Sequence, residues 1–433
     1  MPIASSLIDN IAPQRINNFL KKHDISDSRN NKRELLEDLL SDGKIYDKDL
    51  NEFLYDELMY GNQRLIRIYE LKSTRRICKE AGWDRFLDKF QCDNLNFNKI
   101  ITTNMMHEDG IKIAAIKSQS EDGILTKVEI LFLFNMLKGA RKMSQLEYVY
   151  SYIPAIIDFE NKILIIKVWN REHGVEGHTP LEQLDVVYQQ LVDSLDFDVK
   201  FMEYKAQNVL YRMSKDLFDA FLGQLPNIAE IEAKKDELDD ISNSLLSGIT
   251  WNTAKNVDGK IVLNPEVMQL PEELYKLIQQ TALLDYLKGH DIKSLLRNTD
   301  KYVARIRFND KDNLSASLTG EKGVKCIYDA KTFMCIRNSL DIVERIVAIM
   351  VAFAKDDNTI MYVKYEACDG QFINVHILNG KYYDENDFSQ IWELYKKYEN
   401  ADNEKNETVC SRNNNTAMQK YHSGAVEKEA WCN

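Results

Sequence analysis

The pattern that most limits the fold is a series of apolar, alternating segments between residues 111 and 169, joined by tight turns. Residues 111–117 and 125–134 are connected through Gly123, which tolerates the positive φ of a hairpin turn. Residues 148–159 and 162–169 form a second pair that turns at Glu160 and Asn161. Strands joined by such turns pair antiparallel, without the strand–helix alternation of a doubly wound sheet. The sequence therefore predicts an antiparallel sheet and the α+β class.

Helices are predicted next to this sheet. Thr179 and Glu182 form a capping box, with Pro180 at the first helical position. An acidic, mainly helical connector follows at 205–247, broken at Pro226, and a further helix is predicted at 271–288. The C-terminal part predicts strands at 302–308, 314–318, 324–328, 332–336, 360–366 and 372–378, and helices at 339–353 and 384–398.

A chain of 433 residues is too long for one compact core, so we expect several domains. We predict a helical module at 1–100, a central α+β domain with its helical connector at 101–247, and a C-terminal α+β domain at 271–399. Residues 400–433 are rich in Asn, Glu and Lys and are predicted to be disordered. The predicted fold is thus an N-terminal helical module followed by two mostly antiparallel α+β units.

Two short helices are predicted between residues 12 and 40. Their apolar side chains recur at helical spacing: Ile16, Phe19 and Leu20 in the first helix, and Leu35, Leu36, Leu39 and Leu40 in the second. Asn31 is placed to cap the second helix, with Glu34 three residues later. Five cations gather at the connection between the helices: Lys21, Lys22, Arg29, Lys32 and Arg33. Unpaired amides and cations at a helix start favour an anionic ligand.

These thirty residues resemble the SAP family of helix–extended loop–helix modules. The residues that carry the resemblance are Leu20, Ile25, Lys32, Leu35, Leu36 and Leu39. The chain departs from the family at Asp24 and Arg29, where glycine is usual, although aspartate tolerates a left-handed turn. The resemblance implies binding of DNA, mostly through the phosphate backbone.

A second basic cluster around Arg75 and Arg76 would extend this surface into a continuous strip if it folds beside the first one. Residues 1–100 carry 17 Lys and Arg against 17 Asp and Glu, so the net charge of −12 falls on the rest of the chain. Any DNA-facing surface is therefore expected at the N-terminal end. The order of helices and the segment 50–71 also resemble the centromere protein N family of kinetochore proteins.

Catalytic motifs are incomplete in this sequence. Asp158 and Lys167 flank a hairpin as in PD-(D/E)xK nucleases, but Ile165 replaces the second carboxylate, and a Glu203-x-Lys205 triplet lies elsewhere. His173 and His178, with Glu172 and Glu176, form a loop cluster that lacks a third metal ligand at recognised spacing. No phosphate-binding glycine loop occurs, so no catalytic residue, metal or cofactor is predicted, and whether the protein is an enzyme stays open.

The cysteines are odd in number, scattered and without a Cys-x-x-Cys pair, which is typical of reduced thiols in a cytoplasmic protein. No apolar run is long enough to span a membrane, and 342–353 is interpreted as a buried helix. We therefore predict a cytoplasmic, non-catalytic accessory protein that binds duplex DNA through its N-terminal helices. Its acidic body would recruit a partner protein or self-associate, as in bacterial defence against phage. The alternatives are a metal-dependent nuclease and a protein–protein scaffold without affinity for nucleic acid.

Overall fold

The computed structural model describes residues 3–27, 29–105, 110–139, 146–170, 175, 177–264, 269–296, 298–309, 315–320, 325–328, 331–355, 359–367, 370–378 and 382–400. The fold is α+β, with helices at the N-terminus and a large antiparallel sheet, as the sequence predicts. Residues 401–433, which the sequence predicts to be disordered, lie outside the described residues.

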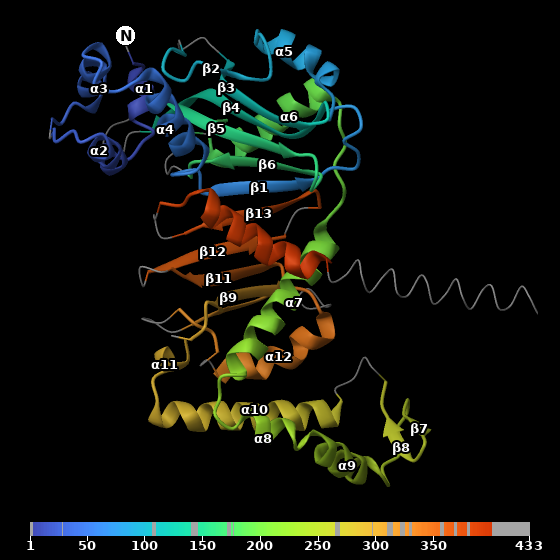
Figure 1. Ribbon diagram of the computed structural model, residues 1–433. Coiled ribbons are helices and arrows are strands. Elements are labelled where there is room, and N and C mark those ends of the chain that lie inside the picture. The colour runs from blue at the N-terminus through green and yellow to red at the C-terminus, as the bar shows by residue number, and fades with distance from the viewer. Residues whose placement is uncertain are drawn as a thin grey trace, which may run out of the picture.

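One antiparallel sheet runs through both predicted α+β units, in the order β10-β9-β11-β12-β13-β1-β6-β5-β4-β3-β2 among the described strands (Figure 1). One half contains β1 (Leu65–Glu70), β2 (Phe97–Asn98), β3 (Ile111–Glu121), β4 (Ile124–Gly139), β5 (Leu146–Asp158) and β6 (Ile163–Val168). The other half contains β9 (Lys301–Asn309), β10 (Ser315–Thr319), β11 (Ala348–Ala354), β12 (Ile360–Glu366) and β13 (Phe372–Ile377). The strand β1 pairs with β6 on one side and β13 on the other, so it joins the two halves.

The first face of the sheet is covered along its length. Over the half that contains β5 lie α1 (Ser5–Ile8), α2 (Pro13–Lys22), α3 (Lys32–Ser41) and α4 (Asp47–Met59). Over the other half lie α7 (Glu203–Leu222), α12 (Lys331–Val343) and a helix at 385–400 (Figure 1). Ile66 and Ile68 of β1 point into this core, which is continuous from the N-terminal helices to the C-terminal strands.

The second face is covered over only one half by described helices. The 3₁₀ helix η1 (Glu80–Trp83), α5 (Asp84–Phe90) and α6 (Pro180–Leu195) pack on the side of β1 that carries Leu65 and Tyr69. Their apolar contacts reach β3 to β6, with Trp83 and Phe86 fully buried. Among the helices that the structure describes, none packs on the same side of β9, β11, β12 and β13.

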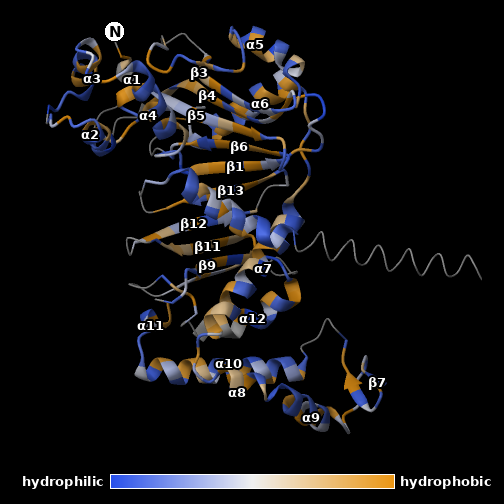
Figure 2. Ribbon diagram, in the orientation of Figure 1, coloured by the Kyte–Doolittle hydropathy of each residue, from blue (hydrophilic) through white to orange (hydrophobic). Residues whose placement is uncertain are grey.

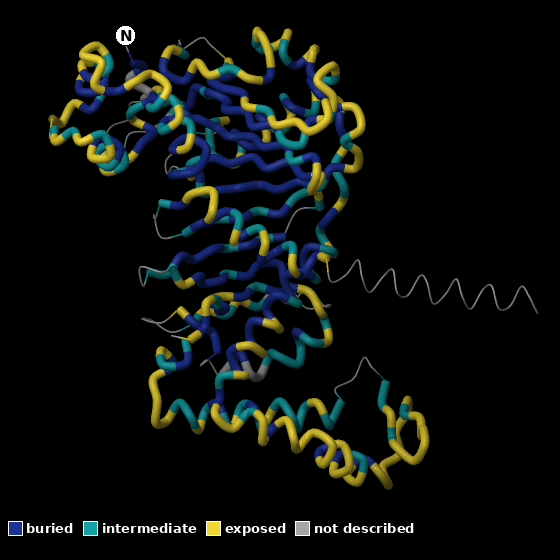
Figure 3. The backbone as a smooth tube through the Cα atoms, viewed as in Figure 1, coloured by how far each residue is buried: buried dark blue, intermediate teal, exposed yellow. Residues whose placement is uncertain are grey.

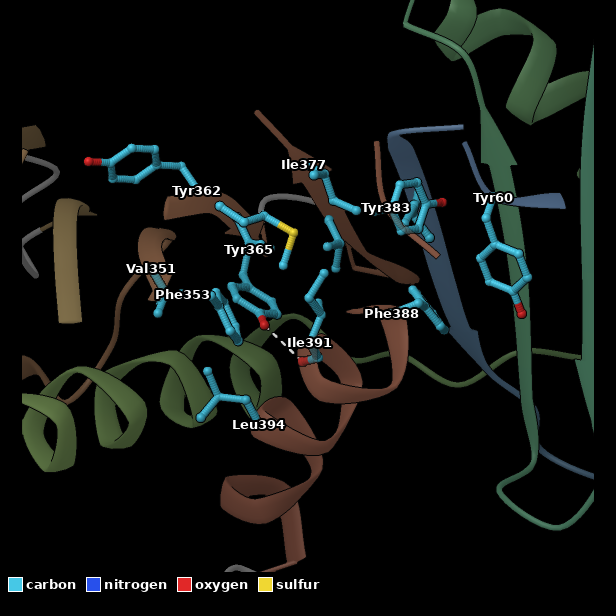
Figure 4. Packing of buried hydrophobic residues seen from close by; sticks show 14 of the residues in the cluster. Tyr60, Val351, Phe353, Tyr362, Tyr365, Ile377, Tyr383, Phe388, Ile391 and Leu394 are labelled. Atoms are coloured by element: carbon cyan, nitrogen blue, oxygen red, sulfur yellow. Dashed lines mark hydrogen bonds between the residues drawn. The ribbon is translucent and has the colours of Figure 1, made fainter. Parts of the chain in front are cut away.

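The helix at 385–400 shows how the first face is closed. Tyr365 of β12 lies between the sheet and this helix and donates a hydrogen bond to the carbonyl of Ile391, 2.8 Å away (Figure 4). Tyr362, three residues earlier on the same strand, points to the opposite side of the sheet (Figure 4). The two faces of β12 therefore differ, one being buried under a helix and the other free of one.

The helix caps follow the sequence closely. The hydroxyl of Thr179 accepts from the backbone N–H of Glu182, and the N–H of Thr179 donates to the Glu182 carboxylate at 2.8 Å, which completes the predicted capping box. Asn31 accepts from the N–H of Glu34 at the start of α3. Asp24 adopts the left-handed conformation, with a φ of 58°, at the position where the SAP family has glycine.

Three predicted elements between 324 and 353 are wrong in whole or in part. Residues 332–336 were expected to form a strand but belong to α12, and the end of the helix expected at 339–353 is the strand β11. The described residues 325–328 form no strand either. Residues 348–353 of the apolar run lie in β11, between β9 and β12, and most of them are buried. Periodicity cannot separate a strand buried on both faces from a buried helix, because both are continuously apolar.

An arm, defined as residues 228–289, extends from the end of the sheet beyond α12 (Figure 1). It consists of α8 (Ile228–Glu232), α9 (Lys235–Leu246), a separate hairpin of β7 (Lys255–Val257) and β8 (Lys260–Val262), and α10 (Leu270–Gly289), after which α11 (Ile292–Leu296) leads back to β9. The arm is mostly exposed or half-buried, unlike the sheet (Figure 3). None of the described helices is long and apolar enough to cross a bilayer.

Candidate nucleic-acid interface

Three of the predicted DNA-binding cations in the N-terminal module are already engaged within the protein. The guanidinium of Arg29 lies 2.9 Å from the carboxylate of Asp27 and 2.6 Å from that of Asp38. Arg33 pairs with Glu37 at 3.0 Å, one turn later on α3. Lys32 is 9% exposed, because α3 packs its first turn against the module. A phosphate would have to compete with these contacts.

The other predicted cations do not gather into one surface. Lys21 and Lys22 are exposed at the end of α2. Arg75 and Arg76 instead follow the C-terminal end of β1. Arg76 pairs with Asp196, the residue after α6. The continuous strip considered from the sequence is therefore not formed. Lys22 instead borders a hollow of about 610 Å³ whose carboxylates are Asp49, Glu52, Asp56, Glu57, Asp384 and Glu385.

The residues of the nuclease-like pattern lie apart. Asp158 caps the β5–β6 turn, where its carboxylate accepts from the backbone and side-chain N–H groups of Asn161 at 2.9 and 2.8 Å. Lys167 lies near the far end of β6. Lys205 pairs with Glu70 and Glu399. The described residues therefore do not assemble the two carboxylates and lysine of such a site.

Lys167 is fully buried and has an unusual environment. Its ammonium group lies 3.7 Å from the ring centroid of Tyr60 and donates to the carbonyl of Met59 at 3.3 Å. Burial lowers the pKa of this lysine to about 7, although Glu129 and Glu385 oppose the shift. Such groups can serve as nucleophiles when substrate reaches them. Because Lys167 is fully buried, with its side-chain nitrogen against the ring of Tyr60 and the carbonyl of Met59, we interpret it as a structural residue.

The predicted histidine cluster lies mostly outside the described residues, since these exclude Glu172, His173 and Glu176. His178 lies 6.3 Å from Phe134, measured between ring centroids. Within the described part of the chain, no group of three or more His, Cys, Asp or Glu side chains could hold a metal ion. Cys78 and Cys92 are free thiols, and Cys326 is buried in the core.

The side of the C-terminal strands on which no described helix packs forms a surface that the sequence analysis did not identify. We call it the open face. In the register of the sheet, Met350 of β11 lies opposite Arg305 of β9 and Lys364 of β12. Ala348 likewise lies opposite Arg307, so all these side chains project on one side. They line a hollow of about 230 Å³ together with Ile349 and Leu378.

Cations outnumber carboxylates around this hollow. Glu366 accepts from both Arg307 and Lys364, at 2.5 and 2.7 Å. Arg305 is exposed and hydrogen-bonds through its guanidinium to the hydroxyl of Ser317 at 3.1 Å. Glu366 therefore pairs with two of these three cations, and the guanidinium of Arg305 meets no carboxylate in the described chain. Two of the three cations also lie on alternate residues of one strand, which fixes their spacing.

His376 of β13 extends the same side of the sheet, opposite Lys364. Its Nε2 lies 3.1 Å from the amide nitrogen of Asn170. Burial lowers the pKa of His376 below its usual value of 6.5, and the charge of Lys364 adds to the shift while Glu366 opposes it. The imidazole is therefore neutral at pH 7, and the positive charge of the open face comes from its arginines and lysine.

No known protein-family model matches the chain, and no curated protein is similar enough to count as a relative. The functional argument consequently depends on the residues themselves. A signal for the open face was present in the sequence, because Arg305 and Arg307 alternate with apolar residues in a predicted strand. Lys364 lies about sixty residues later in the sequence, and only the sheet brings it near these arginines.

Proposed function

We propose that this protein is a non-catalytic, DNA-associated accessory protein that contacts the phosphate backbone with its open face. The observation that carries the proposal is the imbalance of charge among the described residues there, with Arg305, Arg307 and Lys364 around the carboxylate of Glu366. Arginine suits phosphate because its guanidinium donates two parallel hydrogen bonds. The SAP-like sequence of the N-terminal helices supports the same ligand class, although their cations are partly engaged.

The geometry of the open face suits a backbone better than a single small anion. Arg305 and Lys364 lie on β9 and β12 with β11 between them, so their backbones are roughly 10 Å apart across the sheet. Flexible side chains at that separation can reach successive phosphates. Contacts of this kind fix position and carry no base specificity. We therefore expect sequence-tolerant binding that weakens steeply with salt, since each neutralised phosphate releases a counterion.

Fluorescence anisotropy with a short labelled duplex, at about 50 mM and about 200 mM salt, tests the proposal. Replacing both Arg305 and Lys364 by alanine is expected to weaken binding and to lower the slope of log affinity against log salt by roughly 2. The matched control is the pair Lys44→Ala and Lys48→Ala, which removes the same charge from exposed positions of the N-terminal module. The control should bind as the parent does.

The predicted N-terminal contact is tested with Lys21→Ala and Lys22→Ala, because Lys32 is buried and its replacement would disturb the fold. Loss of binding in this variant, with the open-face variant unaffected, would show that the N-terminal helical module, and not the open face, contacts the DNA. If the parent protein shows no affinity for the duplex at low salt, the DNA-associated function is wrong.

A further inference from the structure

The arm exposes apolar side chains to an extent that the rest of the described chain does not. Seven of the fourteen large hydrophobic residues that are exposed lie within it: Ile241, Leu245, Ile249, Trp251, Val257, Val262 and Leu277. Figure 2 shows hydrophobic residues along α9 and α10 and in the β7–β8 hairpin at this end of the molecule. Exposed apolar surface of this kind is typical of a site of association.

Helix α10 is the element of the arm least suited to an exposed position. It spans twenty residues and is rich in Leu, Ile, Ala and Tyr, yet only Gln279 and Leu283 are buried among its described residues. Leu277 is 55% exposed. A helix that is apolar on most of its circumference normally lies inside a protein or an interface. Among the described helices, α8, α9 and α12 contact part of its surface, and the rest is available to another partner.

The sequence of α10 indicates which partner fits. Read from both ends towards its middle, the helix is nearly symmetric: Leu274 corresponds to Leu287, Tyr275 to Tyr286, Leu277 to Leu284 and Ile278 to Leu283. The charges are inverted rather than repeated, since Glu273 corresponds to Lys288 and Lys276 to Asp285. If two such helices pair antiparallel through their exposed side, Leu277 of each meets Leu284 of the other, and the start of one helix meets the end of the other.

The exposed residues agree with this arrangement. Glu272 is exposed in the first turn of α10, while Lys288 is exposed in the last. Between them, exposed Leu277 and Thr281 and half-buried Leu284 lie three or four residues apart, on one side of the helix. The two ends of this stripe carry opposite charges that are complementary only in the antiparallel orientation.

We propose that two copies of this chain associate through α10, paired antiparallel about a two-fold axis that passes near Gln280 and Thr281. A two-fold interface is self-complementary, because the contact of residue i with residue j occurs twice. Leu277 of each copy then covers Leu284 of the other, and Glu272 of each lies near Lys288 of the other. The proposal does not depend on the DNA-associated function, because α10 lies outside the open face.

Sedimentation of the full chain over a range of concentrations tests this inference. The parent is expected to form a dimer, and Leu277→Glu is expected to weaken dimerisation by roughly tenfold or more, since it places a carboxylate against an apolar residue. Leu181→Glu is the matched control, because Leu181 is 48% exposed on α6, away from the arm. A parent that stays monomeric overturns the inference, as does a Leu277→Glu protein that dimerises like the parent.

Charge exchange tests the orientation. Glu272→Lys alone and Lys288→Glu alone each place like charges together and should weaken the dimer at low salt. The two changes combined restore opposite charges and should restore dimerisation. Failure of the combination to do so contradicts antiparallel pairing. Circular dichroism of each variant confirms that loss of the dimer is not loss of the fold.

Discussion

The burial of Lys167 lowers the free energy of unfolding at neutral pH. In the folded protein its pKa is lowered to about 7, from 10.5, with burial as the main cause. Between those pH values the unfolded chain binds more protons than the folded one, so the free energy of unfolding rises with pH by up to about 1.4 kcal/mol per unit. Below that window both states are protonated and the penalty of burying the charge is complete.

Replacing Lys167 with methionine is therefore expected to stabilise the protein by about 1–4 kcal/mol at neutral pH, since a buried charge gives way to an apolar side chain. The gain should shrink as the pH is raised towards 10.5, because the lysine of the parent becomes neutral in both states. Urea unfolding at several pH values measures this dependence. A gain that stays constant with pH would contradict the assignment.

Gly61 is the glycine whose conformation the fold most clearly requires. It follows α4 with a φ of +45°, and a Cβ at this position would lie 2.6 Å from the carbonyl oxygen of Glu57. Its N–H donates to the carbonyl of Tyr383 at 3.2 Å. Gly61→Ala is expected to destabilise the protein by about 1–3 kcal/mol. Gly289→Ala is the control, since it meets no atom within 4 Å, and should change the unfolding midpoint little.

At the scale of single elements, the caps are the features that short-range sequence describes best. Thr179 begins α6, which covers the second face over β5 and β6. Thr179→Ala leaves the first amides of α6 without their side-chain acceptor, and we expect a loss of about 1 kcal/mol in the free energy of unfolding. Thr179→Ser keeps the hydroxyl and should lose much less. Equal losses in the two variants would show that the cap is not the cause.

Helix α12 and strand β11 illustrate the opposite case. Residues 333–353 are apolar at most positions, with polar residues interspersed as far as Arg345, and local propensity does not locate the change from helix to strand. The position of β11 follows from its pairing with β9, which precedes it in the sequence, and with β12, which follows it. Only these long-range hydrogen bonds decide which residues leave the helix.

At the scale of the molecule, β1 makes the two halves of the sheet depend on each other. Leu65 to Tyr69 pair with β13, and Ile66 and Ile68 belong to a core shared with the C-terminal helix and strands. A fragment of residues 1–247 would expose this edge and core. We expect the fragment to aggregate or to lack native-like protection of the β1 amides in hydrogen exchange. The fragment 1–400 is the control and should behave as the full chain.

A soluble 1–247 fragment with protected β1 amides would instead support the domain boundaries predicted from the sequence. Those boundaries remain predictions, because the α+β pattern of each half is the same whether or not the halves share a sheet. Sequence patterns predict which residues form strands. They do not predict which other strand pairs with each edge of a strand.

The sequence by itself determined the α+β class, the N-terminal helices, the capping box at Thr179 and the turn at Asp24, because these depend on contacts within a few residues. Tertiary structure alone decided that Arg76 pairs with Asp196, and that Arg305, Arg307 and Lys364 meet on a face where no described helix packs. The difference is physical. Caps and turns are satisfied by neighbouring backbone groups, whereas a charged surface depends on which distant side chains the sheet brings together.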